Sequence, residues 1–322
     1  MRIRPLIVLS AVTVTGILLA GCTSAPAEPD ATSPSTPGAE CILDAPAGTD
    51  SDAIEVTGDA PQFDVTVPEG LAFEDIQRTV LTEGSGRDLA TGDFVSGAYT
   101  VVDGTSGDVL VDSSTLSADD AGFVPMLLDP TNYSIFVAAL ECLPLGSTVA
   151  LTIPGSAFGE GGTPVVVVAS SVDELDTRAD GADQQPVDGM PTVALADDGA
   201  PTITLPGGEP PADVELAALK TGDGSTVESG DTVFVQYTGV KWSDGSVFDS
   251  SWDRGYPSAF ATTGVVEGFQ QALEGQTVGS QMLVVIPPAF GYGEGEINDS
   301  DLTGETLVFV VDILGVERAA TE

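Results

Sequence analysis

Tyr237-Thr238-Gly239 begins a run of four short motifs that decides the fold of this chain. The other three are Phe248-Asp249-Ser250-Ser251, Val265-Val266-Glu267-Gly268-Phe269 and Ala289-Phe290-Gly291-Tyr292-Gly293. The motifs are rich in aromatic and aliphatic residues, and no His, Cys or Lys stands among them. This composition predicts an apolar pocket with very little proton chemistry. Such a pocket suits a reaction in which no covalent bond breaks.

The region around these motifs is repeated earlier in the chain. Residues 82–100 (TEGSGRDLATGDFVSGAYT) align with residues 220–238 (KTGDGSTVESGDTVFVQYT), and Leu140-Glu141 aligns with Leu273-Glu274. A repeat of this length predicts two copies of one domain rather than a solenoid of small units. We call them the first repeat (41–175) and the second repeat (191–318).

Each repeat is predicted to be a strand-rich domain with one short helix, an α+β fold. The predicted strands of the second repeat are 233–237, 281–286 and 306–314, after a leading hairpin made of 191–195 and 201–205. The predicted helices place apolar residues at i, i+3 and i+7, namely Val266, Phe269 and Leu273 in the second repeat and Tyr133, Phe136 and Leu140 in the first.

The order and spacing of the four motifs resemble the FK506-binding-protein (FKBP) family of peptidyl-prolyl cis/trans isomerases, over about residues 215–317. The resemblance implies two tandem FKBP-like domains, each an antiparallel β-sheet wrapped around one short helix. It implies no cofactor and no metal. Its implied ligands are proline-containing unfolded or extended polypeptides and FK506-like macrolides.

The resemblance also implies the site residues of the second repeat. The implied catalytic residues are Tyr237, Asp249, Phe269, Tyr292 and Phe309, and the implied substrate-binding residues are Phe248, Val265 and Val266. Phe269 would form the pocket floor. The Tyr292 hydroxyl and the Val266 backbone N–H would donate to substrate carbonyls, and Asp249 would accept from Tyr237.

The second repeat departs from the family pattern in two places. Ser258 stands where family members often carry an aromatic residue at the pocket edge, ahead of Phe260. The loop 294–302 replaces the usual Ile-Ile-Pro, and either Ile297 or Leu302 is a candidate for that role. The acidic residues of this loop lack EF-hand spacing, so we expect a solvated loop rather than a calcium site. We also expect the loop to favour substrates with basic residues near the proline.

The first repeat is predicted to be non-catalytic, binding chains or setting spacing. It keeps Tyr99, Asp112 and Phe136, the counterparts of Tyr237, Asp249 and Phe269. Its replacements at the other positions are Asn132 and Tyr133 for Val265 and Val266, Phe158 for Tyr292, and Val166 for Phe309. Phe158 has no hydroxyl to donate.

The N-terminus is typical of a secreted lipoprotein. Residues 1–21 combine two arginines with a short apolar run, as in a signal peptide, and Leu19-Ala20-Gly21-Cys22 resembles the bacterial lipobox. We therefore expect lipidation of Cys22, a disordered tether over 22–40, and a lipid-anchored protein on the outer side of the cell membrane. The alternative is an ordinary cleaved signal with a chance Cys.

Charge and residue usage exclude several functions. The net charge of −41 disfavours binding to nucleic acid. The chain has no His, which excludes Ser-His-Asp and Cys-His catalysis and His-ligated zinc. Outside the cytoplasm, Cys41 and Cys142 are expected to form a disulfide, with two free thiols as the alternative.

The sequence therefore predicts a prolyl isomerase that assists the folding of secreted or envelope proteins, with 176–190 as a linker between the repeats. The alternative is a non-catalytic envelope chaperone or scaffold. A third reading, a ligand-binding lipoprotein serving a transporter, is disfavoured because two small repeated domains do not resemble the usual two-lobed binders.

Overall fold

The computed structural model describes residues 41, 45–119, 121–297 and 302–320. The predicted signal segment, Cys22 and the tether 22–40 lie outside the described residues. Both repeats belong to one compact unit of the chain. Within the described residues, no helix is long and apolar enough to cross a membrane.

The elements of the first repeat are α1 (Thr49–Ala53), β1 (Glu55–Thr57), β2 (Asp64–Thr66), β3 (Gln77–Thr82), β4 (Phe94–Asp103), β5 (Val109–Asp112), β6 (Val124–Leu127), α2 (Ser134–Leu140), β7 (Thr148–Ile153) and β8 (Val165–Glu174). After β9 (Ala182–Asp183), the second repeat comprises β10 (Thr192–Leu195), β11 (Pro201–Thr204), β12 (Glu215–Thr221), β13 (Thr232–Lys241), β14 (Val247–Ser250), β15 (Ser258–Ala261), α3 (Glu267–Leu273), β16 (Gln281–Ile286) and β17 (Leu307–Glu317). The predicted strands and both predicted helices of the two repeats are present.

The two large sheets share one antiparallel topology. The second repeat has the strand order β14-β13-β17-β16-β12, with β15 also paired to β13 and β9 added beside β12. The first repeat has the matching order β5-β4-β8-β7-β3, with β6 paired to β4. The order of strands and helix along the chain is also the same in both, as the internal sequence repeat predicts.

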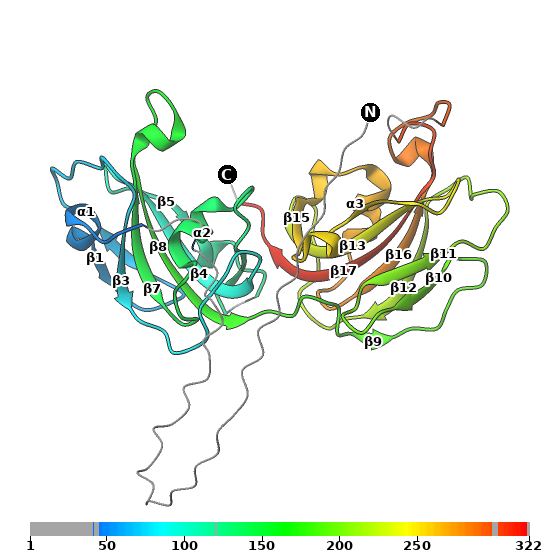
Figure 1. Ribbon diagram of the computed structural model, residues 1–322, viewed down its shortest axis with the longest axis horizontal. Helices are drawn as coiled ribbons and strands as arrows, with labels where there is room; N and C mark the ends of the chain where they lie inside the picture. Colours follow the sequence, from blue (N-terminus) through cyan, green and yellow to red (C-terminus); the bar gives the residue numbers. More distant parts are fainter. Residues whose placement is uncertain (1–40, 42–44, 120, 298–301, 321–322) are drawn as a thin grey trace, which may run out of the picture. The chain divides into compact units, whose positions relative to one another are not determined.

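Each large sheet is buried on both faces, which explains its nearly continuous apolar strands. In β16, Met282, Val284 and Ile286 pack on the side that holds α3, while Leu283 and Val285 pack on the other side. Successive side chains of a strand point to opposite faces, so one strand serves two separate apolar clusters. Figure 1 shows α3 lying against one face of its sheet.

A leading hairpin covers the other face of each sheet. In the second repeat, β10 and β11 pair with each other, and Val193 and Ile203 pack against the apolar face of β16 and β17. In the first repeat, β1 and β2 pair in the same way, and Val56 and Val65 pack on Val102 and its neighbours. The predicted hairpin over 191–205 is thus confirmed.

The segment 176–190 packs against the second repeat and does not extend freely between the two large sheets. Its strand β9 pairs with β12. The N–H of the buried Ala179 donates to the Asp312 carboxylate at 2.8 Å, and Lys220 donates to the Ala179 carbonyl. Burial raises the pKa of Asp312, against the hydrogen bonds that Ala179 and Gln281 donate.

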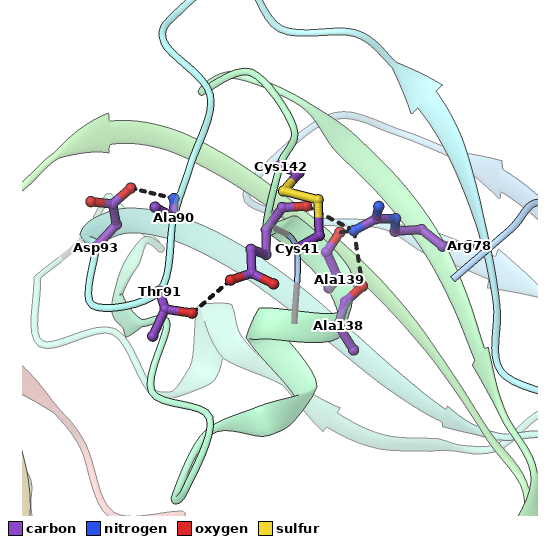
Figure 2. The surroundings of a disulfide bond; sticks show 9 residues. Cys41, Arg78, Ala90, Thr91, Asp93, Ala138, Ala139 and Cys142 are labelled. Carbon is purple, nitrogen blue, oxygen red and sulfur yellow. Dashed lines mark hydrogen bonds between the residues drawn. A yellow bond between two sulfur atoms is a disulfide. The ribbon is translucent and has the colours of Figure 1, made fainter. Parts of the chain in front are cut away.

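Cys41 and Cys142 form a disulfide at the end of α2 (Figure 2). This bond fastens Cys41 to the segment that follows α2, the helix that carries Phe136. The nearby Arg78 guanidinium donates to the carbonyl oxygens of Ala138 and Glu141, at 3.1 and 3.0 Å. Carbonyls at the end of a helix have no partner within it, so this arginine caps α2.

Candidate active site

The second repeat contains an aromatic cup, a cavity of about 290 Å³ between α3 and the sheet. Its walls come from β13, β14, β15, α3 and β17, with three residues from the segment before α3 and one from the loop after β16. The lining residues are Tyr237, Phe248, Asp249, Phe260, Gly264, Val265, Val266, Phe269, Tyr292 and Phe309. All eight catalytic and substrate-binding residues expected from the sequence are therefore brought together.

The floor of the cup is a set of rings in edge-to-face contact. Phe269 and Phe309 have ring centroids 4.9 Å apart, and Phe248 lies 5.4 Å from Phe309 at an interplanar angle of 84°. Aromatic pairs prefer such angles because the positive edge of one ring meets the negative face of the next. Phe269 and Phe309 are only 5% and 6% exposed, so the floor has little contact with water.

The edge of the cup is completed by Phe260. The Phe260 ring contacts Tyr237 and Phe269, with centroid distances of 5.7 and 6.1 Å. Ser258 lies two residues earlier on β15, where its hydroxyl accepts a hydrogen bond from Arg254. The aromatic edge is therefore present although Ser258 is polar.

A polar lock holds the Tyr237 ring in place. The Tyr237 hydroxyl donates to Asp249, and Arg254 donates to the other Asp249 oxygen at 2.6 Å and to the Tyr237 hydroxyl at 2.8 Å. The guanidinium carbon also lies 5.5 Å from the centroid of the Tyr237 ring, within the range of a cation–π contact. Arg254 was not predicted from the sequence.

The lock fixes the protonation state of both groups that it joins. Burial, reinforced by the bond to Asp249, raises the pKa of Tyr237 to about 12. Partial burial by itself would raise the pKa of Asp249, but the hydrogen bonds from Tyr237 and Arg254 outweigh it and leave that pKa below its ordinary value. Near neutral pH, Tyr237 thus keeps its proton and Asp249 its charge, so the pair orients the wall rather than transferring a proton.

Two hydrogen-bond donors at the cup have no acceptor within the described part of the chain. One is the backbone N–H of Val266, the residue that precedes α3. The other is the hydroxyl of Tyr292, whose side chain is 53% exposed at the rim. These two donors are available to the carbonyl groups of a bound peptide.

Of the two loop residues considered for the overhang, Leu302 packs against the apolar cluster below the cup. Ile297 is 57% exposed and lines a different cavity of about 770 Å³, which also includes Trp242 and the buried Glu305. That larger cavity contains one aromatic side chain and several carboxylates, so it lacks the apolar lining of the cup. Residues 298–301 lie outside the described part.

In the first repeat, the counterpart of Phe309 lies one residue later than the sequence alignment placed it. Val166 was expected at the position of Phe309, but Val166 packs on the opposite face of its sheet, with Val102. The neighbouring Val167 faces α2 and pairs with Val101, as Phe309 pairs with Gly239. A shift of one residue moves a side chain to the other face of a strand, and the sequence alignment carried that error.

Comparisons with known proteins agree with the second repeat. Residues 224–314 match the family model "FKBP-type peptidyl-prolyl cis-trans isomerase". The chain is 40% identical over 119 residues to "FK506-binding protein" of Streptomyces anulatus, covering 36% of this chain and 96% of that protein. It is also 40% identical over 114 residues to "Probable FK506-binding protein" of Corynebacterium glutamicum, covering 35% of this chain and 96% of that protein. "Outer membrane protein MIP" of Legionella longbeachae is 33% identical over 110 residues, covering 34% and 47% of the two chains.

Proposed function

The chain belongs to the family of FKBP-type peptidyl-prolyl cis-trans isomerases, and from this premise we propose that its catalytic site is the aromatic cup of the second repeat. The observation that carries the proposal is the combination of a buried aromatic floor with two donors that have no acceptor among the described residues. The substrates we propose are X–Pro bonds in unfolded or extended polypeptides outside the cytoplasm.

The chemistry required is small, because isomerisation only twists an amide. Rotation about the bond costs roughly 18–20 kcal/mol, chiefly through loss of resonance. At the twisted geometry the nitrogen is no longer conjugated and the amide is less polar. An apolar cup holds that state better than water does, and this difference in binding lowers the barrier.

Each group of the cup then has a defined task. Phe269 and Phe309 support the proline ring from below, and Phe260 closes the edge. The Val266 N–H and the Tyr292 hydroxyl would donate hydrogen bonds to the flanking carbonyls of the peptide, which holds the substrate in place while the amide twists. The lock around Asp249 keeps the Tyr237 wall in position, so Asp249 is a positioning residue in this scheme.

The proposed activity is tested by isomerisation of an Ala-Leu-Pro-Phe tetrapeptide and by refolding of a proline-limited protein, each with and without FK506. An isomerase accelerates both reactions, and FK506 abolishes the acceleration. The alternative function, a non-catalytic chaperone or scaffold, predicts suppressed aggregation of the refolding protein with no change in the rate of isomerisation.

The acidic loop points to a preference within this substrate class. Glu294 and Glu296 lie two and four residues after Tyr292, and Asp299 and Asp301 follow in the same loop of the sequence. We expect a higher kcat/KM for peptides with Lys beside the Leu-Pro unit than with Glu, and a smaller difference at high salt because exposed charges are screened. Equal turnover of the two peptides at low salt would remove this preference.

We further propose that a lipid on Cys22 anchors the protein to the outer side of the cell membrane. The Cys41–Cys142 disulfide supports an oxidising compartment, and one relative carries the name of an outer membrane protein. A Cys22→Ala variant should move from the membrane fraction to the soluble fraction. Retention of this variant in the membrane fraction would exclude the anchor.

A further inference from the structure

The first repeat retains the rings of a cup although it lacks several of the site residues. Tyr99 and Phe136 have ring centroids 5.0 Å apart, and Tyr133 stacks on Phe136 at 6.1 Å with an interplanar angle of 8°. Phe136 is 6% exposed, close to the value for Phe269. We call these three residues the first cup.

The polar lock of the second repeat is absent from the first cup. Asp112 accepts from the backbone N–H and the hydroxyl of Ser114, at 3.0 and 2.7 Å. The Tyr99 hydroxyl donates instead to Glu317, at 2.8 Å. Ser117 follows Asp112 at the spacing at which Arg254 follows Asp249, so no cation stands at this position.

Glu317 comes from the second repeat, at the end of β17, and its backbone fits the rim of the first cup. Ser117 and Glu317 form an antiparallel β-bridge. The next residue, Arg318, donates its backbone N–H to the Leu116 carbonyl at 2.7 Å. The Arg318 side chain binds Asp231 of the second repeat at 2.6 Å, which holds the segment from the opposite side.

The Glu317 carboxylate acts electrostatically on both tyrosines of the first cup. Its charge, added to the effect of burial, raises the pKa of Tyr99, and with burial it raises the pKa of Tyr133 to about 12. Tyr133 precedes α2 as Val266 precedes α3. The Glu317 carboxylate therefore binds Tyr99, the counterpart of Tyr237, on the wall of the first cup.

An apolar cluster beside this segment joins the two repeats. Phe94 and Leu127 of the first repeat form one buried cluster with Phe234 and Leu314 of the second, and the Phe94 and Phe234 ring centroids are 5.4 Å apart. The register of β17 is irregular at Leu314, which leaves this residue out of the ladder.

The residue after Leu314 is a glycine that the contact requires. A Cβ atom at Gly315 would lie 2.7 Å from the Pro125 side chain, closer than real Cβ atoms come. Any larger residue would therefore force the strands β6 and β17 apart. The interface depends on a small residue in β17 at the point of closest approach.

We propose that the first cup is a docking site for the chain's own segment Glu317–Arg318, so that each chain presents one open proline cup and not two. A partly buried carboxylate is costly unless it is hydrogen-bonded, and the Tyr99 phenol supplies that bond. A proline peptide entering the first cup has to displace Glu317 from Tyr99. This inference concerns the first repeat and goes beyond the proposed function of the second.

Hydrogen–deuterium exchange on the full chain tests the docking. The probes are the Arg318 amide and the stretch 113–127, compared among wild type, Glu317→Ala, Glu317→Gln and Tyr99→Phe. We expect at least tenfold faster exchange at both probes in Glu317→Ala and Tyr99→Phe, and most of the protection restored in Glu317→Gln, which still offers an oxygen to Tyr99. Glu215→Ala, at an exposed position on β12, is the matched control.

Unchanged exchange in Glu317→Ala would overturn the proposal. The kcat/KM for the tetrapeptide should stay within twofold in all four variants, because neither Tyr99 nor Glu317 lines the second cup. An inactive wild type would remove the proposed function, while the exchange result would still decide the docking.

The NMR signals of the tyrosines, of which the chain has five, report which of the two cups binds a peptide. In ring-labelled protein titrated with the tetrapeptide, the NMR signals of Tyr237 and Tyr292 should shift and those of Tyr99 and Tyr133 should stay in place. Shifts of Tyr99 and Tyr133 over the same range of peptide concentration would show that the first cup is open and would overturn the proposal.

Discussion

Replacing Phe269 by alanine removes the floor of the second cup and should lower kcat/KM for a proline tetrapeptide by tenfold to sixtyfold. The ring is 5% exposed and contacts Phe309, Phe260 and Tyr237. A proline ring resting on this floor buries three methylene groups, at about 0.8 kcal/mol each. The upper bound is therefore about 2.4 kcal/mol of transition-state binding, which is roughly sixtyfold in rate.

The same substitution also weakens the fold, so a matched control is needed. Deleting a buried phenylalanine side chain costs about 3–5 kcal/mol of unfolding free energy. Phe136 occupies the same position in α2 and is 6% exposed, so Phe136→Ala should cost about as much stability. Because Phe136 belongs to the first repeat, that variant should keep kcat/KM within twofold of wild type.

The assay is protease-coupled cleavage of the tetrapeptide at a temperature where circular dichroism shows each variant folded. If Phe269→Ala is unfolded there, Phe269→Leu tests the same floor with a smaller loss of volume. Equal losses of turnover in the Phe269 and Phe136 variants, or an undiminished rate in both Phe269 variants, would refute the assignment of the cup.

Three further outcomes follow from the same geometry. Tyr292→Phe removes one exposed donor, worth about 0.5–1.5 kcal/mol, so kcat/KM should fall about twofold to tenfold; a larger loss would mean that the hydroxyl does more than orient the substrate. The pKa of Asp249 lies below its ordinary value and the pKa of Tyr237 is about 12. The ionised Asp249 therefore stabilises the fold above its unfolded pKa, and this stabilisation is lost only as the pH falls through the lower folded pKa. We expect kcat/KM to be flat from about pH 5.5 to 9, and a bell-shaped profile would contradict this. Converting Cys41 and Cys142 to alanine should lower the unfolding free energy by about 2–5 kcal/mol, because the bond closes a loop with a sequence separation of 101, while turnover at a permissive temperature should not change.

Sequence reasoning predicted the second cup well because its signals are local. Tyr237, Phe269 and Tyr292 each lie in a short motif whose backbone is set by neighbouring residues, and the motifs occur in a fixed order. The strand β16 was predicted with its observed bounds, because five apolar residues in a row after Gln281, between turn signals, leave few alternatives.

The residues that sequence reasoning missed depend on tertiary geometry. Arg254 reaches Asp249 because a short 3-10 turn over Trp252–Arg254 brings the chain back toward the cup. A basic residue five positions after an Asp that is expected in a site is the signal that could have identified it. Phe260 was noted but not placed, because which face of β15 it occupies depends on pairing with β13.

The contact between Tyr99 and Glu317 has no local signal at all. The two residues are separated by most of the chain, and a Glu at the end of a strand is ordinary at a protein surface. The Glu317 carboxylate reaches the Tyr99 phenol only because β17 packs against β6 and the rim of the first cup. Long-range polar pairs of this kind carry no periodicity that a sequence pattern could reveal.

The docking also changes how the preserved tyrosine of the first repeat is interpreted. Tyr99 aligns with Tyr237, and by alignment alone it is a remnant of a catalytic site. In the structure the Tyr99 hydroxyl donates a hydrogen bond to Glu317. Tyr99 therefore has a structural role that does not depend on the rest of a catalytic site. A buried phenol needs a hydrogen-bond partner, and a segment from the second repeat supplies it where Asp112 does not. Retention of Tyr99 is therefore no argument for isomerase activity in the first repeat, and the open cup around Phe269 is left as the catalytic candidate in the described part of the chain.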